Sequence, residues 1–573
     1  MKNPEIADIF DRLADILEFK GEMVFKVASY RKAARTLRDT TEDVAVIAAE
    51  GRLAEMPGIG KATAEKIEEY LKTGKIQRYE EARKGLSDEL IRMLQIPGMG
   101  PKGLALIHSK LKIDTFAGLE EAIRSGRLAE LPGMGPKKAE NILKGIEMLR
   151  EASKRIPLGI ALPIAEDVLA SVRKFRSISR AELAGSLRRM RETIGDIDIL
   201  ASAKDREKAI GQFTSLPQVR RVLAAGTTKA SVIVEGNQQI DLRVVDEDSF
   251  GAALQYFTGS KEHNVKLRDI AKGLGLKVNE YGVFRGDERV CGREEEEVYA
   301  AVGLQWMPPE IREDRGEIEA AREGSLPDLV TLNQLRGDMH VHSKYSDGNA
   351  TLEQLAQRAQ QLGYKYIAVT DHSQSLKIAR GLTPERVEQK RKELQKVNAK
   401  LKGIRLLFGT ELDILPDGTL DYPDEVLEKF DWVVASIHSA FKQPREKITQ
   451  RIISAMENPL VDCIAHPTGR LIGQRSPYEV DVEMILQAAA QTKTAIEINA
   501  NYDRLDLDDI WSKRAKQLGV KLAIGTDAHQ LGHMDMIRLG VAVARRGWLE
   551  PADVLNTLPE EKLRRKRSKS ATH

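Results

Sequence analysis

Hydrophobic residues follow two different spacings along the chain. Near the N-terminus they recur every three to four positions, as in Ile6, Phe10 and Leu13, which predicts an amphipathic helix. The stretch SYRKAARTLR, residues 29–38, predicts a second helix. From about residue 154 shorter runs rich in branched residues indicate a mixture of strands and helices. Two of these runs, SVIVEG and QIDLRVV, are separated only by Asn-Gln and predict a β-hairpin.

After residue 333 the chain alternates regularly between apolar runs and helical stretches. Continuous apolar strands separated by helices are typical of a parallel sheet. Such an alternation predicts a distorted (β/α)7 barrel of the triosephosphate-isomerase type, in which the chemistry lies at the C-terminal ends of the strands. The seven runs are GDMHVH, YKYIAVTDH, IRLLFGTEL, WVVASIH, VDCIAHP, TAIEINA and VKLAIGTDAH.

Composition excludes several classes of protein. Of the 573 residues, 42% are hydrophobic and 31% are charged, which is typical of a folded globular protein rather than a disordered or fibrous one. No stretch approaches the ~18 consecutive apolar residues of a membrane span, and acidic residues near the N-terminus argue against a secretory signal. Two cysteines are too few for a disulfide framework. We expect a cytoplasmic monomer with no membrane partner.

A short motif that occurs three times provides local sites for nucleic acid. Local sites are needed because the 89 basic and 86 acidic residues leave a net charge of only +3. Each copy (MPGIGKATAEKI, IPGMGPKGLALI, LPGMGPKKAENI) has glycines that permit a tight turn, which points backbone N–H groups toward a phosphate oxygen. The motif resembles the helix-hairpin-helix, which holds DNA backbones; a plain helix connection is the alternative. The DNA-binding candidates are Gly58, Gly60, Lys61, Gly98, Gly100, Gly133 and Gly135.

Three acidic residues in the middle of the chain predict a metal site. Asp196 and Asp198 in GDIDIL alternate along one strand and therefore point to the same face. Asp241 in QIDLRVV brings a third carboxylate from a neighbouring strand. Convergent carboxylates form an oxygen-rich site for paired Mg²⁺ or Mn²⁺, as used in phosphoryl transfer. Surface acids without a metal are the alternative.

Two further segments extend this site. Gly185-Ser186 and the following Arg188 and Arg189 can hold a triphosphate with backbone N–H groups and a guanidinium. Together, the Gly-Ser turn, GDID and IDLRV resemble the nucleotidyltransferase palm. The later segment YFTGSKEHNVKLR, residues 256–268, resembles the nucleotide-binding turn of family X DNA polymerases, the class of DNA polymerase beta. The similarity covers about residues 1–315.

This resemblance implies a role for each matching residue. Asp196, Asp198 and Asp241 would bind the catalytic metals, Arg268 would lie along the template, and a dNTP would be the substrate. Position 261 departs from the family, because it holds lysine where the animal relatives have an acid, so nucleotide preference stays open. The implied nucleotide-binding residues are Gly185, Ser186, Arg189, Gly195, Tyr256, Phe257, Gly259 and Asn264.

The N-terminal helices resemble the amino-terminal domain of the same family, which implies roles for two lysines. Lys26 matches a phosphate-binding lysine, and Lys66 matches the Schiff-base lysine of a deoxyribose-phosphate lyase. A second basic residue of that pocket aligns with Ala62. A solvated helix lysine is the alternative for Lys66, so lyase activity stays open.

Histidine is concentrated after residue 333, where eight of the ten fall. A single histidine at a strand end is more often structural, but here ligand-type residues end six of the seven apolar runs. Imidazole and carboxylate ligands suit Mn²⁺, Zn²⁺ or Fe²⁺, and nine of them can hold up to three ions. The nine are His340, His342, Asp347, His372, Glu411, His438, His466, Asp527 and His529.

This ligand pattern resembles the polymerase-and-histidinol-phosphatase (PHP) domain, a metal-dependent phosphoesterase barrel, over about residues 333–573. With the polymerase-like half, it indicates a bacterial family X polymerase. The resemblance implies a gap-filling DNA repair polymerase with 3′–5′ exonuclease activity and cleavage at abasic sites. The alternatives are a barrel that only supports the polymerase and a barrel that acts as a small-molecule phosphatase.

The same resemblances divide the chain into six parts within a multidomain protein of α+β and α/β class. The expected partners are dNTPs and gapped or primer-template DNA with a downstream 5′-phosphate. The parts are an N-terminal helix-hairpin-helix domain (1–80), a second helical domain (81–153), the palm (154–245), the thumb (246–315), a polar linker (316–332) and the PHP barrel (333–573).

Overall fold

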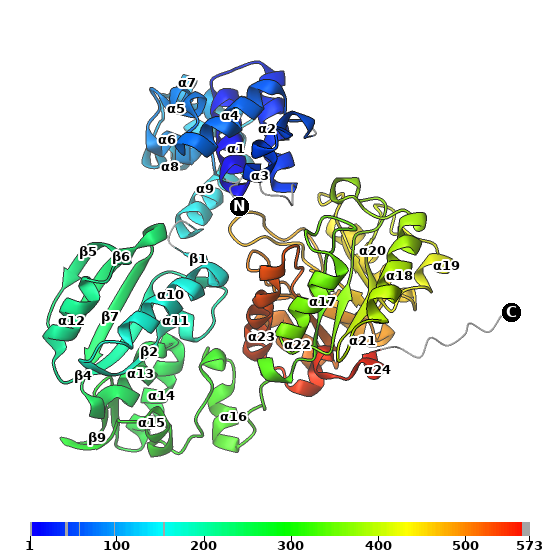
Figure 1. Ribbon diagram of the computed structural model, residues 1–573. Helices are drawn as coiled ribbons and strands as arrows, with labels where there is room; N and C mark the ends of the chain where they lie inside the picture. The colour runs from blue at the N-terminus through cyan, green and yellow to red at the C-terminus, as the bar shows by residue number, and fades with distance from the viewer. Residues whose placement is uncertain (1–2, 40–43, 57, 97, 153–154, 564–573) are drawn as a thin grey trace. The chain divides into compact units, whose positions relative to one another are not determined.

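The computed structural model describes residues 3–39, 44–56, 58–96, 98–152 and 155–563 (Figure 1). It separates the chain into two compact units, Met1–Lys154 and Arg155–His573. The six-part division is finer than these units and stays a prediction. Pro57 and Pro97, which belong to two of the repeated motifs, lie outside the described residues. No helix in the described ranges has the length and apolar composition needed to cross a bilayer.

The first unit consists of helices around one apolar core. The expected face of Ile6, Phe10 and Leu13 is fully buried, and the predicted segment 29–38 lies within the second helix. The helices are α1 (Asn3–Phe19), α2 (Val24–Asp39), α3 (Val44–Ala49), α4 (Lys61–Thr73), α5 (Gln77–Arg83), α6 (Asp88–Met93), α7 (Pro101–Leu111), α8 (Phe116–Arg124) and α9 (Pro136–Ala152).

The three repeated motifs form three turns of the same kind. Helices α4, α7 and α9 each begin directly after the second glycine of a motif. The first glycine of each has a positive φ (Gly58 +86°, Gly98 +82°, Gly133 +75°), a conformation that side chains disfavour. The sequence spacing therefore reproduces one backbone geometry three times, with the N-terminus of a helix behind each turn.

The second unit opens with a mixed five-stranded sheet. Its order is β2-β4-β7-β6-β5, with β4 and β7 parallel at the centre. The predicted hairpin is confirmed as β6 and β7, but four residues (235–238) connect them instead of two, because Gly236 turns the chain with φ +75°. The elements are β1 (Ile156–Pro157), α10 (Leu158–Val172), β2 (Ile178–Leu183), α11 (Gly185–Arg188), β3 (Thr193–Ile194), β4 (Ile197–Ala203), α12 (Arg206–Thr214), β5 (Val219–Ala225), β6 (Lys229–Val234) and β7 (Gln239–Val245).

A small helical layer with a three-stranded sheet follows. The segment expected as a polar linker is not an open connection, because it carries helix α16, whose Ile318 and Ala321 pack into the core of this layer. The many charged residues of this segment made its short apolar face difficult to recognise in the sequence. The elements are α13 (Phe250–Thr258), α14 (Lys261–Gly273), β8 (Lys277–Asn279), β9 (Gly282–Arg285), β10 (Glu288–Cys291), α15 (Glu295–Ala301) and α16 (Glu317–Glu323).

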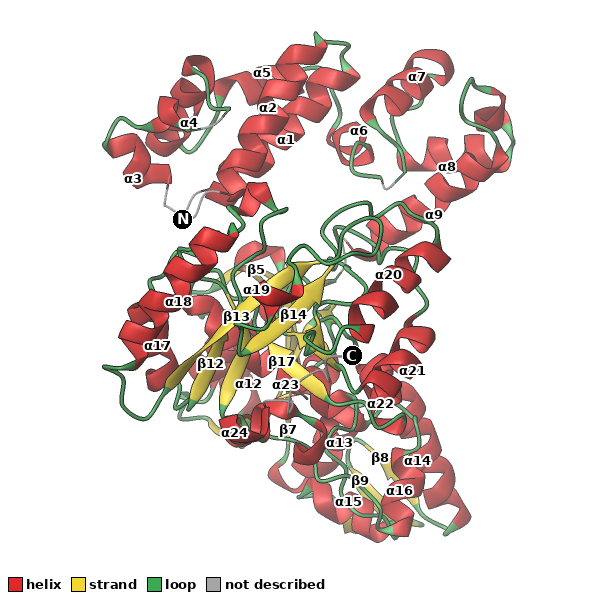
Figure 2. Ribbon diagram, turned by 90° about the vertical axis from the view of Figure 1, so that its right-hand side faces the viewer, coloured by secondary structure: helices red, strands yellow, loops and turns green. Residues whose placement is uncertain are grey.

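The last part is the predicted barrel. Seven parallel strands follow one another in chain order, and a bridge between Val341 and Ala528 joins the two ends of the sheet. Figure 2 shows its strands with α17, α18, α20 and α21 around them. The strands are β11 (Gly337–Val341), β12 (Tyr366–Val369), β13 (Arg405–Asp413), β14 (Trp432–Ser436), β15 (Cys463–Ile464), β16 (Ala495–Asn499) and β17 (Leu522–Gly525). The helices are α17 (Leu352–Gln361), α18 (Pro384–Asn398), α19 (Asp424–Leu427), α20 (Arg445–Glu457), α21 (Val482–Thr492), α22 (Asp509–Gln517), α23 (Ile537–Arg546) and α24 (Glu560–Leu563).

A buried ion pair stabilises the small helical layer that follows the five-stranded sheet. Arg312 is fully buried and donates to Glu295, with 2.6 Å between Nη1 and Oε1. We expect Arg312→Leu to lower the free energy of unfolding by about 3–5 kcal/mol, because it leaves a buried carboxylate short of a partner. Denaturant unfolding followed by circular dichroism measures this loss. Arg322→Leu, at an exposed position of α16, is the control, and an equal small effect of both variants would contradict the expectation.

Candidate active sites

The first candidate site lies where two central palm strands run side by side. The parallel register pairs Asp198 of β4 with Asp241 of β7, and Asp196 immediately precedes β4. One carboxylate oxygen from each lies within 4.8 Å of the others. The structure thus brings the three predicted metal ligands together.

Electrostatics at these carboxylates favours a bound cation. Burial, together with the charges of Asp196 and Asp241, raises the pKa of Asp198 to about 7. Burial would also raise the pKa of Asp241, but hydrogen bonds from Lys229 and Gln239 hold it below its ordinary value. The Lys229 Nζ lies 2.5 Å from an Asp241 oxygen. The ammonium group thus already supplies one positive charge at a position that suits a metal ion, and the three oxygens fit a Mg²⁺ or Mn²⁺ pair.

A glycine turn closes one side of this site. Gly185 has φ +61°, and a Cβ there would lie 2.3 Å from Asp198 Oδ2. Only glycine therefore lets the turn and Ser186 approach the carboxylate. Gly195 lies next to Asp196 and accepts a hydrogen bond from Gln238 at 2.8 Å.

Most of the predicted nucleotide-binding residues line one pocket of about 300 Å³. Arg188 does not belong to it, because its guanidinium forms two hydrogen bonds with Glu295 at 2.8 and 2.9 Å. Gly185, Ser186 and Gly195 are not among the lining residues. The lining is Arg189, Tyr256, Phe257, Thr258, Gly259, Lys261, Asn264 and Arg268.

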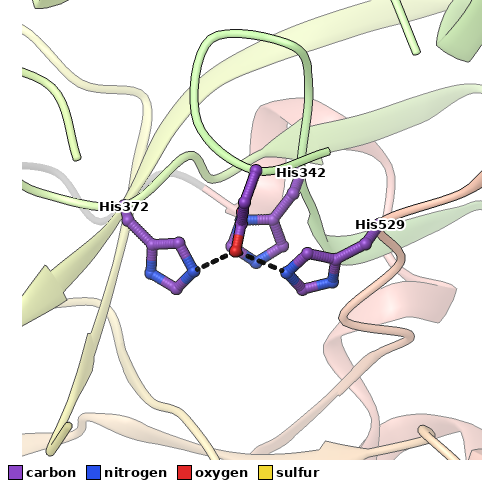
Figure 3. Close-up of side chains that lie close together, drawn as sticks. His342, His372 and His529 are labelled. Atoms are coloured by element: carbon purple, nitrogen blue, oxygen red, sulfur yellow. Dashed lines mark ion pairs between the residues drawn. The ribbon is translucent and has the colours of Figure 1, made fainter. Parts of the chain in front are cut away.

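The second candidate site lies at the C-terminal ends of the barrel strands. Eight of the nine predicted ligands fall into three overlapping groups whose ligand atoms lie within 4.8 Å of one another. The ninth, His466, has its Nε2 2.9 Å from Glu411. Figure 3 shows how the rings of His342, His372 and His529 lie close together. The groups are His342, Asp347, His372 and His529; His340, His342, Glu411 and Asp527; and His372, Glu411 and His438.

Glu411 lies at the centre of this cluster. Its two oxygens are 2.9–3.5 Å from ring nitrogens of five histidines: His340, His342, His372, His438 and His466. A carboxylate in that position can bridge two ions. Asp527 and His466 have positive φ values of +53° and +29°, which are uncommon for residues with a side chain and recur at functional sites.

Several buried ligand atoms form no well-aligned hydrogen bond among the described residues, although some of them lie within ion-pair distance of one another. Such atoms are costly unless an ion or another polar group satisfies them. The donor set also fits ions that prefer imidazole and carboxylate. Burial and the neighbouring His529 and His372 lower the pKa of His342 to about 4, which favours the neutral form that a metal ligand needs. At His438 and His529 the effect of burial is outweighed by Glu411 and Asp347, which raise the pKa to about 9, so an ion would have to displace their protons. The orphaned atoms are His340 Nε2, His342 Nδ1 and Nε2, His372 Nδ1 and Glu411 Oε2.

Two acids that the sequence reading missed hold these ligands in orientation. Glu497 on β16 accepts from His340 Nδ1 at 2.7 Å, and Asp413 on β13 accepts from His438 Nδ1 at 2.7 Å. Carboxylates behind metal-binding histidines commonly fix the ring and its tautomer. Asp413 lies two residues after Glu411 on the same strand, so alternation along the strand could have predicted that both side chains share a face.

The first unit presents its predicted DNA-binding residues at the surface. Lys61 opens α4 and is exposed, Lys26 pairs with Glu22 at 3.2 Å, and Lys66 donates to the carbonyl of Ala62 at 2.8 Å. A residue not expected from the sequence is Lys32, whose side chain covers Gly58 so closely that a Cβ there would lie 2.6 Å from its Cε. Lys32 thus adds a cation above the first glycine turn.

The raised pKa of Asp198 predicts a pH-dependent stability. Its pKa is about 7 in the folded protein and 3.8 in an ordinary environment, so ionisation opposes folding. This cost is absent at pH 3.8 and below, grows as the pH rises, and is complete above about pH 7. In EDTA, Asp198→Asn should therefore melt several degrees higher than the parent at pH 8, with a smaller difference at pH 5. Saturating Mn²⁺ should stabilise the parent more than the variant, and a pH-independent difference would contradict the assignment.

Comparisons with known proteins agree with this geometry. Family models match a helix-hairpin-helix domain at residues 1–76, a SAM-like helix-hairpin-helix tandem at 90–148, the thumb of DNA polymerase beta at 253–313 and a PHP domain at 338–501. A probable phosphatase of Thermoanaerobacter sp. (strain X514) is 32% identical over 232 residues, which is 38% of this chain and 89% of that protein.

One relative covers nearly the whole chain. The protein named DNA polymerase/3′–5′ exonuclease PolX of Bacillus subtilis (strain 168) is 41% identical over 560 residues, 97% of each chain. The 560 aligned residues include the helix-hairpin-helix motifs, the five-stranded sheet, the thumb and the barrel described above. The chain therefore belongs to the bacterial family X DNA polymerases that carry a C-terminal PHP domain.

Proposed function

We propose that this protein fills short gaps in DNA by template-directed nucleotidyl transfer and that its barrel degrades DNA in the 3′–5′ direction. The observation that carries the first activity is the carboxylate triad, and the pocket lined by Arg189, Tyr256 and Asn264 supports it. The second activity rests on the nine-ligand cluster of the barrel. The relative named for both activities, which matches 97% of the chain, supports the combination.

In the palm, each residue has a separate task. Asp196, Asp198 and Asp241 hold two divalent ions, Mg²⁺ or Mn²⁺, which supply Lewis-acid chemistry at the reacting phosphate. The N–H groups of the Gly185 turn and the Arg189 guanidinium bind the triphosphate oxygens. Ser186 and Gly195 also serve the triphosphate. Tyr256, Phe257, Gly259 and Asn264 contact the sugar and base of the dNTP, and Arg268 lies along the template.

In the barrel, the ligand set holds up to three ions. Six imidazoles favour Mn²⁺, Zn²⁺ or Fe²⁺ over Mg²⁺, and such a cluster supplies Lewis-acid chemistry for phosphodiester hydrolysis. A structural site is closed by its ligands, whereas a catalytic one leaves an open position. Here the side chains of His529 and Asp347 stay 30% and 22% exposed, which gives a phosphate access. This opening favours a catalytic barrel over a purely structural one.

The helical first unit would hold the DNA. We assign backbone phosphate contacts to its three glycine turns and to Lys61, and the downstream 5′-phosphate to Lys26. The proposed form is a monomer in the cytoplasm, where DNA and dNTPs are found. Cleavage at abasic sites and a lyase step at Lys66 stay predictions of the family resemblance. The six-part domain division is proposed on the same basis.

The two centres should be separable by mutation. We expect His342→Ala or Asp527→Ala to reduce 3′–5′ degradation by more than about a hundredfold, since loss of an outer partner alone costs up to that much in a metal site. Polymerisation should stay near the parental rate, because the palm has its own ligands. Asp198→Ala should have the opposite effect. The assay uses full-length protein on one labelled primer-template with Mn²⁺.

Two outcomes of this assay would overturn the assignment. If degradation persists in both barrel variants and disappears in Asp198→Ala, the nuclease lies in the palm. If the parent degrades nothing with Mn²⁺, Zn²⁺, Fe²⁺ or Mg²⁺, the barrel is structural.

A downstream 5′-phosphate should strengthen binding to a short gap. We expect several-fold tighter binding than to a 5′-hydroxyl gap at low salt, and salt should erode the difference because phosphate contacts release counterions. Lys26→Ala should reduce the preference. Lys72→Ala, which changes an exposed lysine of α4, is the matched control. Fluorescence anisotropy measures both affinities, and equal affinities at low salt would contradict the proposal.

A further inference from the structure

Helix α23 of the barrel ends against the polymerase palm. Its last residue, Arg546, is only 5% exposed. The guanidinium donates from Nη1 to the backbone oxygen of Arg189 at 2.7 Å and to Glu313 at 3.0 Å. Its Nη2 donates to Asp509 of α22 at 2.7 Å. One barrel side chain therefore joins α22 to the palm turn that carries Arg189.

Glu313 connects Arg546 to the side chain of Arg189, which lines the nucleotide pocket. The carboxylate also accepts from Arg189 Nε at 3.1 Å and lies 3.5 Å from an Arg191 nitrogen. Its side chain is only 9% exposed. Arg189 is therefore linked to Arg546 in two ways. Its backbone carbonyl accepts a hydrogen bond from Arg546, and both guanidinium groups donate to Glu313. The Arg189 Nη1 donates to the carbonyl of Thr258 at 2.5 Å, and Thr258 lines the pocket.

Arg546 affects Arg189 because three guanidinium groups share the one carboxylate of Glu313. Arg189 and Arg191 share Glu313 with Arg546, so the carboxylate is not fully committed to Arg189. Without Arg546, Glu313 would pair more closely with Arg189 and draw it away from an incoming anion. The loop that carries Glu313 would also lose its link to the barrel, which includes a contact from Arg546 to the Glu310 carbonyl at 3.4 Å.

We infer that Arg546, a residue of the barrel, is a positioning residue for the nucleotide pocket of the polymerase. It fixes the turn and the carboxylate that orient Arg189, and it does not touch the nucleotide itself. This inference rests on the proposed role of Arg189 in binding the triphosphate. The barrel accordingly supports DNA synthesis through a defined contact as well as carrying its own centre.

A second contact on the same helix provides a matched control. Arg538 pairs with Glu166 of α10 at 2.9 Å, so it also joins the barrel to the palm. Both partners are exposed, at 39% and 47%, and neither lines the nucleotide pocket. Loss of this pair weakens the same interface without altering Arg189.

The test compares Arg546→Met, Arg546→Lys and Arg538→Met in full-length protein. Steady-state extension of a gapped primer gives KM for the dNTP and kcat, and degradation of a labelled single strand reports on the barrel. We expect Arg546→Met to raise KM by about tenfold, the effect of losing one charged hydrogen bond. Arg546→Lys should recover part of this loss. Arg538→Met should match the parent, and degradation should be unchanged in all three.

Further variants distinguish a failure of the proposed role of Arg189 from a failure of the inference about Arg546. Arg189→Ala tests the proposed function: if its KM equals that of the parent, the role of Arg189 is wrong. If Arg189→Ala raises KM while Arg546→Met and Arg538→Met agree within twofold, only the inference about Arg546 is overturned. Combining Arg189→Ala with Arg546→Met should add little to the effect of Arg189→Ala alone, and full additivity would overturn the inference as well. If Arg546→Met does not fold, Asp509→Asn replaces it, because Asp509 accepts from Arg546 Nη2 and its loss loosens Arg546 while Glu313 keeps its charge. A rise in KM is again expected, and its absence would be equally decisive.

Discussion

Strands fixed in register force ionisable side chains together, and both centres depend on this constraint. In the palm, β4 and β7 place three carboxylates so close that burial and mutual repulsion keep one of them partly protonated near neutral pH. In the barrel, strand ends bring five imidazoles around one glutamate. In the barrel, several of the crowded ligand atoms form no hydrogen bond within the part of the chain that the structure describes. The backbone that creates the crowding also creates the affinity for cations.

Much of this arrangement follows from local patterns in the sequence. Asp196, Asp198 and Asp241 were recognisable because alternation on a strand fixes which side chains share a face. The barrel ligands were recognisable because they end apolar runs, and the ends of parallel strands meet at one face. Lys32 escaped notice because its place above Gly58 depends on how α2 packs against the turn.

Contacts between distant segments could not be predicted in this way. Glu497 supports His340 from a strand 157 residues away, and Arg546 reaches Arg189 across 357 residues. No local spacing encodes such pairs, because they depend on how completed domains pack. The same limit applies to α16, whose apolar face appears only once the neighbouring helices form its surroundings. Sequence patterns thus identified the chemistry, whereas the supports of that chemistry required the fold.

The two ends of the barrel sheet meet at a seam between β11 and β17. The bridge of Val341 and Ala528 includes the hydrogen bond from the His342 N–H to the Ala528 carbonyl, and the N–H of Asp527 donates to the His340 carbonyl beside it. His340 and Asp527 are ligand candidates from opposite sides of this seam. His340 and Asp527 would hold an ion together with His342 and Glu411, and that ion would link the first and last strands of the barrel. Binding of an ion there would therefore stabilise the closed ring of strands as well as complete the centre, because its ligands come from both ends of the sheet.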